Sequence, residues 1–336
     1  MPIKFAVLGD GAWGTAIALV LNQNADHRVV LWSAREENAR ILRERRENVR
    51  LLPGVPIPQS IELTTDVKQA LDGADLGVMA IPTVFVRETM RRIAPHVHQD
   101  LPIVSLAKGL ENDTFLRPTE IVQQVLGPRA LAVLSGPSHA EEVSRGSPTT
   151  VVAASLSYDL SRWVQERFHT DRFRVYTNTD VVGVELAGAL KNIIGIAAGV
   201  CDGLGLGDNA KAALMTRGLV EIARFGIALG AEQQTFFGLA GVGDLITTCI
   251  SKHGRNRHVG ERLARGGKLS QILATMNMVA EGVYTTRSVH DKALKMDLDM
   301  PITAEVYRML YEDKDPRAAV QDLMRREPTS ESDFGP

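Results

Sequence analysis

The sequence predicts an α/β protein in which an N-terminal doubly wound, mostly parallel sheet is followed by an all-helical domain. Through the first half, short apolar runs alternate with amphipathic stretches, as in repeated strand–helix–strand units. The first run leads directly into a glycine-rich turn. From Asp180 onward, the β-branched runs give way to long segments rich in Ala, Leu, Gly and Ile, which favour helices.

The apolar runs have the length of buried strands, and the stretches between them are expected to be mostly helical. The expected strands are Ile3 to Leu8, Val29 to Trp32, Leu76 to Ile81, Ile103 to Ala107, Leu131 to Leu134, Thr149 to Ala154 and Phe173 to Tyr176. The sheet domain is expected to span residues 1–178 and the helical domain residues 179–327. The polar tail, residues 328–336, is expected to be frayed.

The helical half is expected to begin with two long helices, Val181 to Val200 and Ala210 to Ala228, followed by shorter ones to about Arg326. Val181 to Cys201 is about as long as a membrane span, but Glu185, Lys191 and Asn192 lie within it. Polar groups at that depth in lipid are costly, so a buried core helix is predicted.

The composition is that of a globular protein, with 336 residues, 23% charged residues and a formal net charge of −2. Near-neutral charge argues against nucleic acid or a membrane surface as the partner and favours a small molecule. Two cysteines are too few for a disulfide framework, and the N-terminus reads as a strand and turn rather than a signal peptide. A cytoplasmic protein with no metal site is therefore predicted.

The turn Gly9-Asp10-Gly11-Ala12-Trp13-Gly14 fits the dinucleotide-binding pattern of a Rossmann-type domain, directly after a strand and before a helix. Gly9 permits the tight turn, Gly11 lets the backbone approach a pyrophosphate, and Gly14 lets the helix pack closely on the strand. The helix N-terminus then faces the anion. The alternative is a glycine turn without a ligand.

The end of the second strand indicates which dinucleotide is bound. An acid there binds the ribose of NAD, whereas a nearby arginine accommodates the additional phosphate of NADP. Ser33 and Arg35 favour NADP, while Glu36 and Glu37 leave NAD open. The following arginines are interpreted as a solvated helix face, since acids are interleaved with them; they are Arg40, Arg43, Arg45 and Arg46.

Polar residues follow later strands, at the edge where open α/β sheets bind ligands. Lys108 is placed to donate to a phosphate or carbonyl, with a solvated surface lysine as the alternative. The segment Ser135-Gly136-Pro137-Ser138-His139-Ala140 follows another strand. His139 is interpreted by default as a histidine in a loop.

Lys191 lies in a predominantly apolar helix, where desolvation would lower its pKa and make it a usable proton shuttle. The alternatives are a lysine that pairs with Glu185 or extends outward to solvent. Asp244 follows a flexible glycine turn, and the pair Arg255-Asn256 offers donors suited to a phosphate.

These residues together resemble the soluble NAD(P)-dependent glycerol-3-phosphate dehydrogenases of bacteria, from Ile3 to about Glu327. The blocks that carry the resemblance are Gly9-x-Gly11-x-Trp13-Gly14, Lys108-Gly109-Leu110-Glu111, Ser135-Gly136-Pro137-Ser138-x-Ala140, Glu185-x-x-Gly188-x-x-Lys191-Asn192, Gly238 to Leu245, Arg255-Asn256 and Val279 to Val283. One departure is Gly254, where the family commonly has serine, so a side-chain contact to the phosphate is missing there.

The resemblance implies a role for each matching position. Lys191 would donate or accept the proton, and Lys108 would touch both cofactor and substrate. The other implied substrate contacts are Gly136, Ser138, Asp244, Arg255 and Asn256. The other implied cofactor contacts are Gly9, Gly11, Ala12, Trp13, Gly14, Ser33, Arg35, Ala140, Arg255, Val279 and Glu281.

The implied reaction is reversible hydride transfer between NADPH or NADH and dihydroxyacetone phosphate, giving sn-glycerol 3-phosphate for glycerophospholipid synthesis. A homodimer is also implied. Two other functions stay open from the residues alone. A β-hydroxyacid dehydrogenase shares the two-domain plan and the helix-borne lysine but would not need Asp244 or Arg255-Asn256. A non-catalytic NADP-binding sensor would keep the glycine turn and tolerate loss of Lys191.

Overall fold

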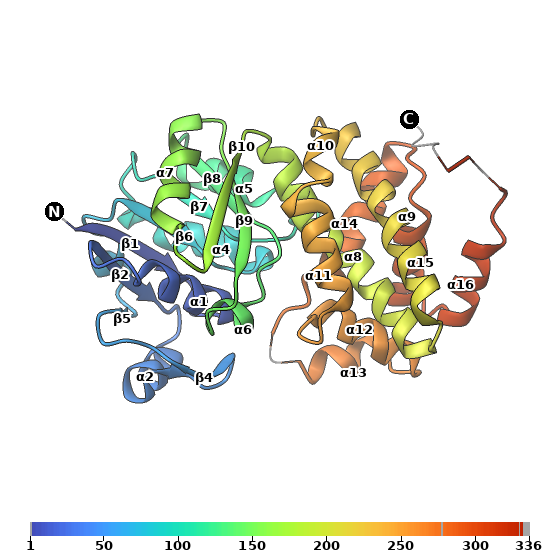
Figure 1. Ribbon diagram of the computed structural model, residues 1–336, viewed down its shortest axis with the longest axis horizontal. Helices are drawn as coiled ribbons and strands as arrows, with labels where there is room; N and C mark the ends of the chain where they lie inside the picture. Colours follow the sequence, from blue (N-terminus) through green and yellow to red (C-terminus); the bar gives the residue numbers. More distant parts are fainter. Residues whose placement is uncertain (1, 277, 329, 332–336) are drawn as a thin grey trace. The chain divides into compact units, whose positions relative to one another are not determined.

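A computed structural model describes residues 2–276, 278–328 and 330–331. The chain forms two compact units, the first from Met1–Ala107 and Pro118–Val181, the second from Lys108–Arg117 and Val182–Pro336 (Figure 1). The domain limits 1–178 and 179–327 stay predictions, and the assignment of Lys108–Arg117 to the second unit was not predicted. The expected frayed tail lies mostly outside the described residues.

The first unit is built on an eight-stranded sheet with the order β10-β9-β8-β7-β6-β1-β2-β5. Its strands are β1 (Ile3–Leu8), β2 (His27–Trp32), β5 (Glu62–Thr64), β6 (Leu76–Met79), β7 (Ile103–Ser105), β8 (Leu131–Ser135), β9 (Thr149–Ala154) and β10 (Phe173–Asn178). All neighbours pair in parallel except β8 and β9. The predicted doubly wound, mostly parallel sheet is confirmed.

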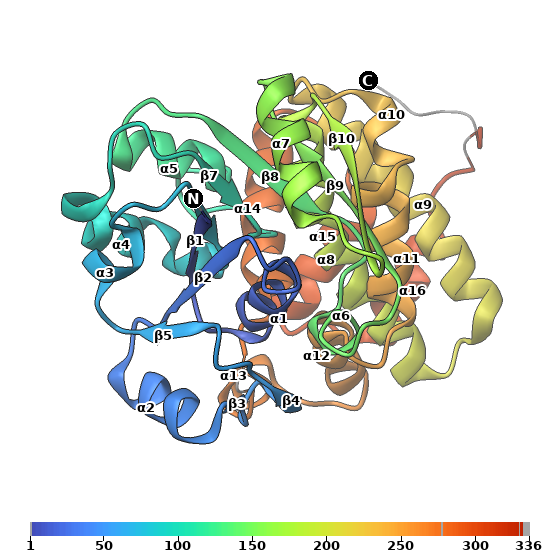
Figure 2. The same cartoon turned by 60° about the vertical axis from the view of Figure 1, so that its left-hand side comes forward.

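Helices cover this sheet on both faces. They are α1 (Ala12–Leu21), α2 (Glu36–Arg45), α3 (Val67–Leu71), α4 (Thr83–Ile93), the 3₁₀ turn η1 (Ala94–His96), α5 (Pro118–Leu126), α6 (Ala140–Val143) and α7 (Tyr158–Phe168). In Figure 2, α1 and α7 lie against one face, and α4 and α5 pack together against the other. Strands covered on both sides must be apolar throughout, which accounts for the continuous apolar runs in the sequence.

The strand order reverses direction between β1 and β6. From β1 the chain proceeds outward to β2 and β5, then returns to place β6 on the other side of β1. Ligands of open α/β sheets bind where the order reverses, outside the carboxyl ends of the strands. Gly9 stands directly after β1 at this point, with a φ of 117° that favours glycine.

The stretch between α2 and α3 is the main departure from the expected helices. It contains the antiparallel pair β3 (Glu47–Asn48) and β4 (Leu52–Pro56), followed by β5. Pro53, Pro56 and Pro58 interrupt any helical hydrogen-bond ladder there, since proline lacks the N–H donor, and Gly54 has a φ of 75°, outside the helical region. Extended backbone is the outcome.

The second unit is helical, as predicted. Its elements are α8 (Val181–Leu204), α9 (Gly207–Ala228), α10 (Gln233–Phe236), the π-helical turn η2 (Leu239–Gly243), α11 (Asp244–Ile250), α12 (Arg255–Ala264), α13 (Leu269–Ala274), α14 (Glu281–Lys295), α15 (Pro301–Tyr311) and α16 (Pro316–Met324). Helix α8 is long and apolar enough to cross a membrane, yet 89% of its most apolar window is buried inside the protein. It is the core helix of this unit.

The segment Lys108–Arg117 leaves the sheet after β7 and packs onto the helical unit. Arg117 Nη1 lies 2.8 Å from Glu185 Oε2, and the Glu185 side chain is only 1% exposed. The Phe115 ring packs edge-on against Phe225, and the Asn192 amide donates to the Lys108 carbonyl at 2.9 Å. These contacts fix Lys108 relative to α8.

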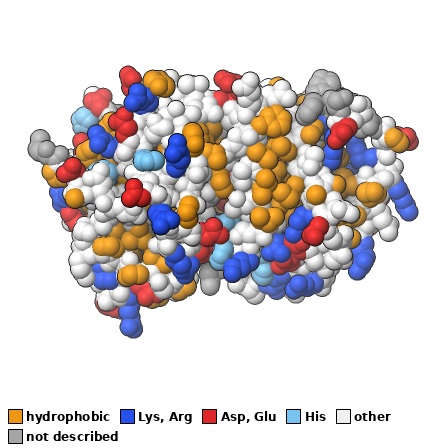
Figure 3. All heavy atoms as spheres, in the orientation of Figure 1, with side chains coloured by type: hydrophobic (Ala, Val, Ile, Leu, Met, Phe, Trp, Pro, Cys, Tyr) orange, Lys and Arg blue, Asp and Glu red, His pale blue; other side chains and the backbone are white. Residues whose placement is uncertain are grey.

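The surface carries mixed charge. On the face shown in Figure 3, basic and acidic side chains are interspersed. This agrees with the nearly balanced totals of 38 Lys and Arg against 40 Asp and Glu.

Candidate active site

The helical unit contains a cluster of two ammonium groups on one buried carboxylate. Lys191 Nζ lies 3.0 Å from Asp244 Oδ1, and Lys108 Nζ lies 2.8 Å from Asp244 Oδ2. Lys191 is 6% exposed and Asp244 3%. Lys191 therefore pairs with Asp244, and the alternative of a pair with Glu185 is wrong because Glu185 is bound by Arg117. The alternative of a solvated Lys108 is wrong too.

Helix packing brings the members of this cluster together. Asp244 opens α11, directly after the π-helical turn, and Thr248 follows one turn later on the same face. Thr248 Oγ1 accepts a 2.5 Å hydrogen bond from Lys191 Nζ. A side chain at Gly195 on α8 would meet the Thr248 methyl group at 2.6 Å, so only glycine lets α11 approach α8 this closely. Thr248 is thus held against Lys191.

The charges of the cluster set its protonation. Burial lowers the pKa of Lys191 from 10.5 to about 8, opposed by the Asp244 charge and reinforced by the Lys108 charge. Burial alone would raise the pKa of the Asp244 carboxyl, but Lys108 and Lys191 hold it below its ordinary value. The site therefore combines a permanent carboxylate with an ammonium that releases its proton near neutral pH.

A second chain of polar contacts links this cluster to the start of α12. Asn256 Nδ2 donates to Asn192 Oδ1 at 2.9 Å, and Asn256 Oδ1 accepts from the Gly282 backbone N–H at 3.0 Å. The Asn256 side chain is buried at 8% exposure and holds α8, α12 and α14 together. Arg255 Nη1 donates to the Val279 carbonyl at 3.0 Å. Arg255, Asn256 and Val279 are thus gathered near the N-terminus of α14, whose first residue is Glu281.

The N-terminus of α12 resembles an anion site in its backbone chemistry. Its N-cap is Gly254, and no described side chain caps the helix there. N–H groups in a first turn that no side chain caps, together with the helix dipole, favour a phosphate. Gly254 has no side chain, so only the backbone N–H groups and Arg255 could contribute to such a site at this end of α12.

In the sheet unit, the glycine turn has the geometry of a dinucleotide cradle. A side chain at Gly14 would meet the Gly9 carbonyl at 1.9 Å, whereas one at Gly11 would meet no protein atom within 4 Å. Gly14 therefore serves close packing, and Gly11 leaves open space in front of the backbone. No described side chain caps α1, and Trp13 Nε1 is buried without a described partner. These features fit a pyrophosphate at the start of α1.

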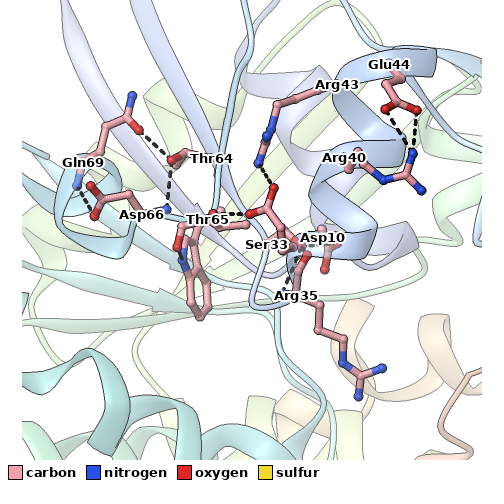
Figure 4. A network of polar contacts seen from close by, with 12 residues as sticks. Asp10, Ser33, Arg35, Arg40, Arg43, Glu44, Thr64, Thr65, Asp66 and Gln69 are labelled. Carbon is pink, nitrogen blue, oxygen red and sulfur yellow. Dashed lines mark hydrogen bonds and ion pairs between the residues drawn. The ribbon is translucent and has the colours of Figure 1, made fainter.

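The end of β2 is organised around Ser33. Its buried hydroxyl lies 2.7 Å from Asp10 Oδ2 and 3.0 Å from the Arg35 carbonyl. Arg35 is exposed and begins α2 as its N-cap residue. In Figure 4 its guanidinium extends away from the Arg40–Glu44 ion pair.

One part of the predicted solvated helix face is wrong. Arg40 and Arg43 are exposed and pair with Glu44 and Glu36. Arg46 instead ends α2 in the left-handed region, with a φ of 49°, and donates to the carbonyls of Ile57, Pro58 and Ile61. Arg46 anchors the extended stretch that follows. Its guanidinium supplies hydrogen bonds to carbonyl groups that lie outside any helix and so have no N–H partner four residues on.

The segment after β8 places the remaining predicted residues at one edge of the sheet. Gly136 has a φ of 133° and packs against Val151. Ser138 Oγ donates to the Gly136 carbonyl at 2.8 Å, and Ala140 is the buried first residue of α6. His139 is the N-cap residue of α6.

Two polar residues at these places carried no predicted role. Thr248 was detectable as the residue four positions after Asp244, on the same helix face. Asp10 was detectable as an acid in the loop after β1, because parallel neighbours bring the ends of β1 and β2 together. For both residues, the indication of a role comes from their position beside other site residues in the fold and not from a sequence motif.

Comparison with known proteins identifies a family whose two models together match nearly the whole chain. The model of the NAD-dependent glycerol-3-phosphate dehydrogenase N-terminus matches residues 4–161, and that of the C-terminus matches residues 180–321. Glycerol-3-phosphate dehydrogenase (NAD(P)+) of Chlorobium phaeobacteroides strain BS1 is 50% identical over 98% of this chain and 99% of its own. The Bacillus pumilus protein of the same name is 49% identical over 98% of this chain and 96% of its own.

The solved structures agree. The 2.1 Å crystal structure of glycerol-3-phosphate dehydrogenase from Coxiella burnetii superposes with a TM-score of 0.92 at 41% identity, covering 96% of this chain and 99% of that one. The family models for both halves of the chain, the sequence relatives and the solved structure all indicate the same family. The chain therefore belongs to the family of NAD-dependent glycerol-3-phosphate dehydrogenases.

Proposed function

We propose that the chain reversibly reduces dihydroxyacetone phosphate to sn-glycerol 3-phosphate with NADH or NADPH, with Lys191 as the group that handles the proton. The observation that carries the role of Lys191 is its ammonium in the interior of α8, bound by Asp244 and Thr248, with a pKa lowered to about 8. A general acid works best when its pKa lies near the working pH.

The nicotinamide dinucleotide fits the residues of the first unit. Gly9, Gly11, Ala12, Trp13 and Gly14 would hold its pyrophosphate through backbone N–H groups and the α1 dipole. Ser33 and Arg35 would hold the adenosine end, and Lys108, Ala140, Arg255, Val279 and Glu281 are further proposed contacts. When bound, the dinucleotide supplies the hydride.

The protein's part in the chemistry is electrostatic and protonic. In the reducing direction, Lys191 gives its proton to the substrate oxygen that becomes negative. Lys108 and Lys191 carry two positive charges against the single charge of Asp244, so the cluster retains a net positive charge toward that oxygen. A preorganised charge in a site that excludes water stabilises developing anions more than water does.

The other proposed substrate contacts are assigned by matching residues to the phosphate and hydroxyl groups of the substrate. The N-terminus of α12 and the Arg255 guanidinium suit the phosphate, with Asn256 holding that helix start in place. Asp244 accepts hydrogen bonds from hydroxyl groups. Gly136 and Ser138 are proposed substrate contacts from the sheet unit, on the resemblance of their motif.

We also propose that the enzyme is a cytoplasmic homodimer and supplies glycerol 3-phosphate for glycerophospholipid synthesis. Cys201 and Cys249 are both buried, free thiols, which suits a reducing compartment. The dimer rests on the family resemblance.

One assay tests the reaction against both other candidate functions. Purified protein is mixed with NADH or NADPH and dihydroxyacetone phosphate, and the nicotinamide absorbance is followed. We expect oxidation of the nucleotide, and none when a β-hydroxyacid dehydrogenase substrate, a 3-oxo acid, replaces the phosphate ester. Oxidation only with the oxo acid would indicate a β-hydroxyacid dehydrogenase. Nucleotide binding without any oxidation would indicate a sensor.

A further inference from the structure

The turn that would hold the dinucleotide contains an acid facing the end of β2. Asp10 Oδ2 lies 2.7 Å from the Ser33 hydroxyl. The Asn48 side chain donates to the Asp10 carbonyl at 2.8 Å and to Thr15 Oγ1 at 2.9 Å. Because Asn48 is buried, it fixes the backbone of the turn and with it the Asp10 carboxylate beside Ser33.

Glu36, one of the two acids that the sequence offered for a ribose contact, is already bound elsewhere. Glu36 accepts hydrogen bonds from Arg43 at 2.9 Å and from Thr65 Oγ1 at 2.8 Å. These hydrogen bonds lower the pKa of its carboxyl, the one from Thr65 most strongly. In Figure 4, Asp10 lies beside Ser33.

The group that distinguishes the two dinucleotides is the substituent on the adenosine ribose, a hydroxyl in NAD and a phosphate in NADP. A hydroxyl donates to a carboxylate, whereas a phosphate dianion beside a carboxylate is repelled. Arg35 offers donors for either substituent and a positive charge that favours the phosphate. Ser33 donates its hydroxyl proton to Asp10, so in this arrangement its oxygen can accept from a ribose hydroxyl but cannot donate to a phosphate. The Asp10 carboxylate, beside the same Ser33 hydroxyl, has the opposite effect to Arg35: it favours the ribose hydroxyl of NADH over the phosphate of NADPH.

We propose that Asp10 is a specificity-determining residue for the dinucleotide, offsetting Arg35 so that NADH remains a good partner alongside NADPH. This rests on the proposed dinucleotide site of the first unit. The carboxylate accepts from the ribose hydroxyl of NADH through its free acceptor capacity and penalises the additional phosphate of NADPH.

The test measures binding of NADPH and NADH to the full-length protein by nucleotide fluorescence, with no substrate present. For Asp10→Asn, we expect the ratio of the NADH to the NADPH dissociation constant to rise roughly tenfold, the effect of about 1.4 kcal/mol. For Arg35→Ala, we expect the ratio to fall by a similar factor. The kcat/KM with dihydroxyacetone phosphate should change in the corresponding sense, in favour of NADPH for Asp10→Asn and in favour of NADH for Arg35→Ala.

The matched control is Glu44→Gln, which removes one negative charge from α2 without touching Ser33. An unchanged ratio in Asp10→Asn, an equal weakening of both nucleotides, or an equal shift in Glu44→Gln would each overturn the proposal. Because binding is measured without substrate, a shifted ratio supports the role of Asp10 even if reduction of dihydroxyacetone phosphate fails. If wild-type protein binds neither nucleotide, the dinucleotide site itself is wrong and Asp10 has no such role.

Discussion

The Asp244 carboxylate binds Lys191 through one oxygen, at 3.0 Å, and Lys108 through the other, at 2.8 Å. Lys108 begins the segment Lys108–Arg117 and Lys191 lies in the middle of α8, so a single acid orients two ammonium groups that are distant in sequence. In the proposed reaction, this arrangement would supply the proton and the electrostatic stabilisation, and the predictions below test that role.

Replacing Lys191 by alanine should lower kcat by about 10²- to 10⁴-fold, the usual range for loss of a general acid. The affinity for NADH should be largely kept, because Lys191 is not among the proposed nucleotide contacts. Stopped-flow or steady-state kinetics and nucleotide fluorescence measure the two quantities. Lys252→Ala removes an exposed lysine between α11 and α12 and is the control, with turnover expected to match wild type. Near-normal turnover in Lys191→Ala would remove Lys191 from its proposed role.

The pH dependence should have opposite signs in the two directions. With a pKa of about 8, Lys191 is protonated below that pH and neutral above it. Ketone reduction needs the protonated form, so its kcat should fall as pH rises through about 8, whereas oxidation of glycerol 3-phosphate should accelerate over the same range. In Asp244→Asn the charge that raises the Lys191 pKa is absent, so the limb should move to lower pH. Identical profiles in both directions would contradict the assignment.

Replacing Arg255 by alanine should raise KM for dihydroxyacetone phosphate with a smaller effect on kcat. Loss of a charge-assisted hydrogen bond costs about 1.5 to 3 kcal/mol, which corresponds to roughly 10- to 150-fold in KM. Arg265→Ala removes the same charge from the opposite end of α12 and should leave KM unchanged. If the two variants behave alike, the phosphate is bound elsewhere.

A buried acid outside the active site predicts a pH-dependent stability. Glu221 accepts hydrogen bonds from the Ile302 and Thr303 backbone N–H groups, both at 2.8 Å, and burial raises its pKa from 4.5 to about 6. The folded state therefore holds this proton more tightly than the unfolded state between these two pH values. Stability contributed by this group is lost as pH rises through about 6, by roughly 2 kcal/mol since one pKa unit is about 1.4 kcal/mol.

Thermal unfolding of wild type and Glu221→Gln from pH 4.5 to 7 measures this contribution. The glutamine amide lacks the second carboxylate oxygen, so the variant should be less stable throughout, and its Tm should lack the part of the pH dependence that Glu221 supplies. Lowering the pH should thus stabilise wild type relative to the variant. A constant difference in Tm across the range would show that Glu221 does not titrate there.

The fold was predictable because its signals are local. The apolar run from Ile3 to Leu8 and the turn at Gly9 need only backbone sterics and burial to be recognised. The short strands β3, β4 and β5 were missed because they are too short to carry a sustained alternation, and in β4 the prolines Pro53 and Pro56 also exclude a helix. The excursion of Lys108–Arg117 was missed because it is fixed by tertiary contacts such as Arg117 with Glu185.

The candidate site, too, was predictable only in part from the sequence. Lys191 was recognisable because a lysine in an apolar helix is costly and demands a reason. The ion-pair partner of Lys191 could not be predicted from the sequence. Glu185 is six positions away on the same helix, whereas Asp244 comes from another helix, and only the packing of the helices decides between them. Thr248 and Asp10 belong to residue types that are common at turns and on helices, so their chemistry emerges only from their neighbours.

The path of Lys108–Arg117 has a consequence for attempts to divide the protein. The chain enters the helical unit at Lys108, leaves it after Arg117 and returns at Val182, so neither unit is one continuous stretch of polypeptide. A fragment cut near residue 178 would leave one ammonium group behind on the sheet fragment and the carboxylate that binds it on the other. Halves of this enzyme exchanged with those of a relative would therefore have to carry Lys108–Arg117 with the C-terminal partner to keep the cluster matched.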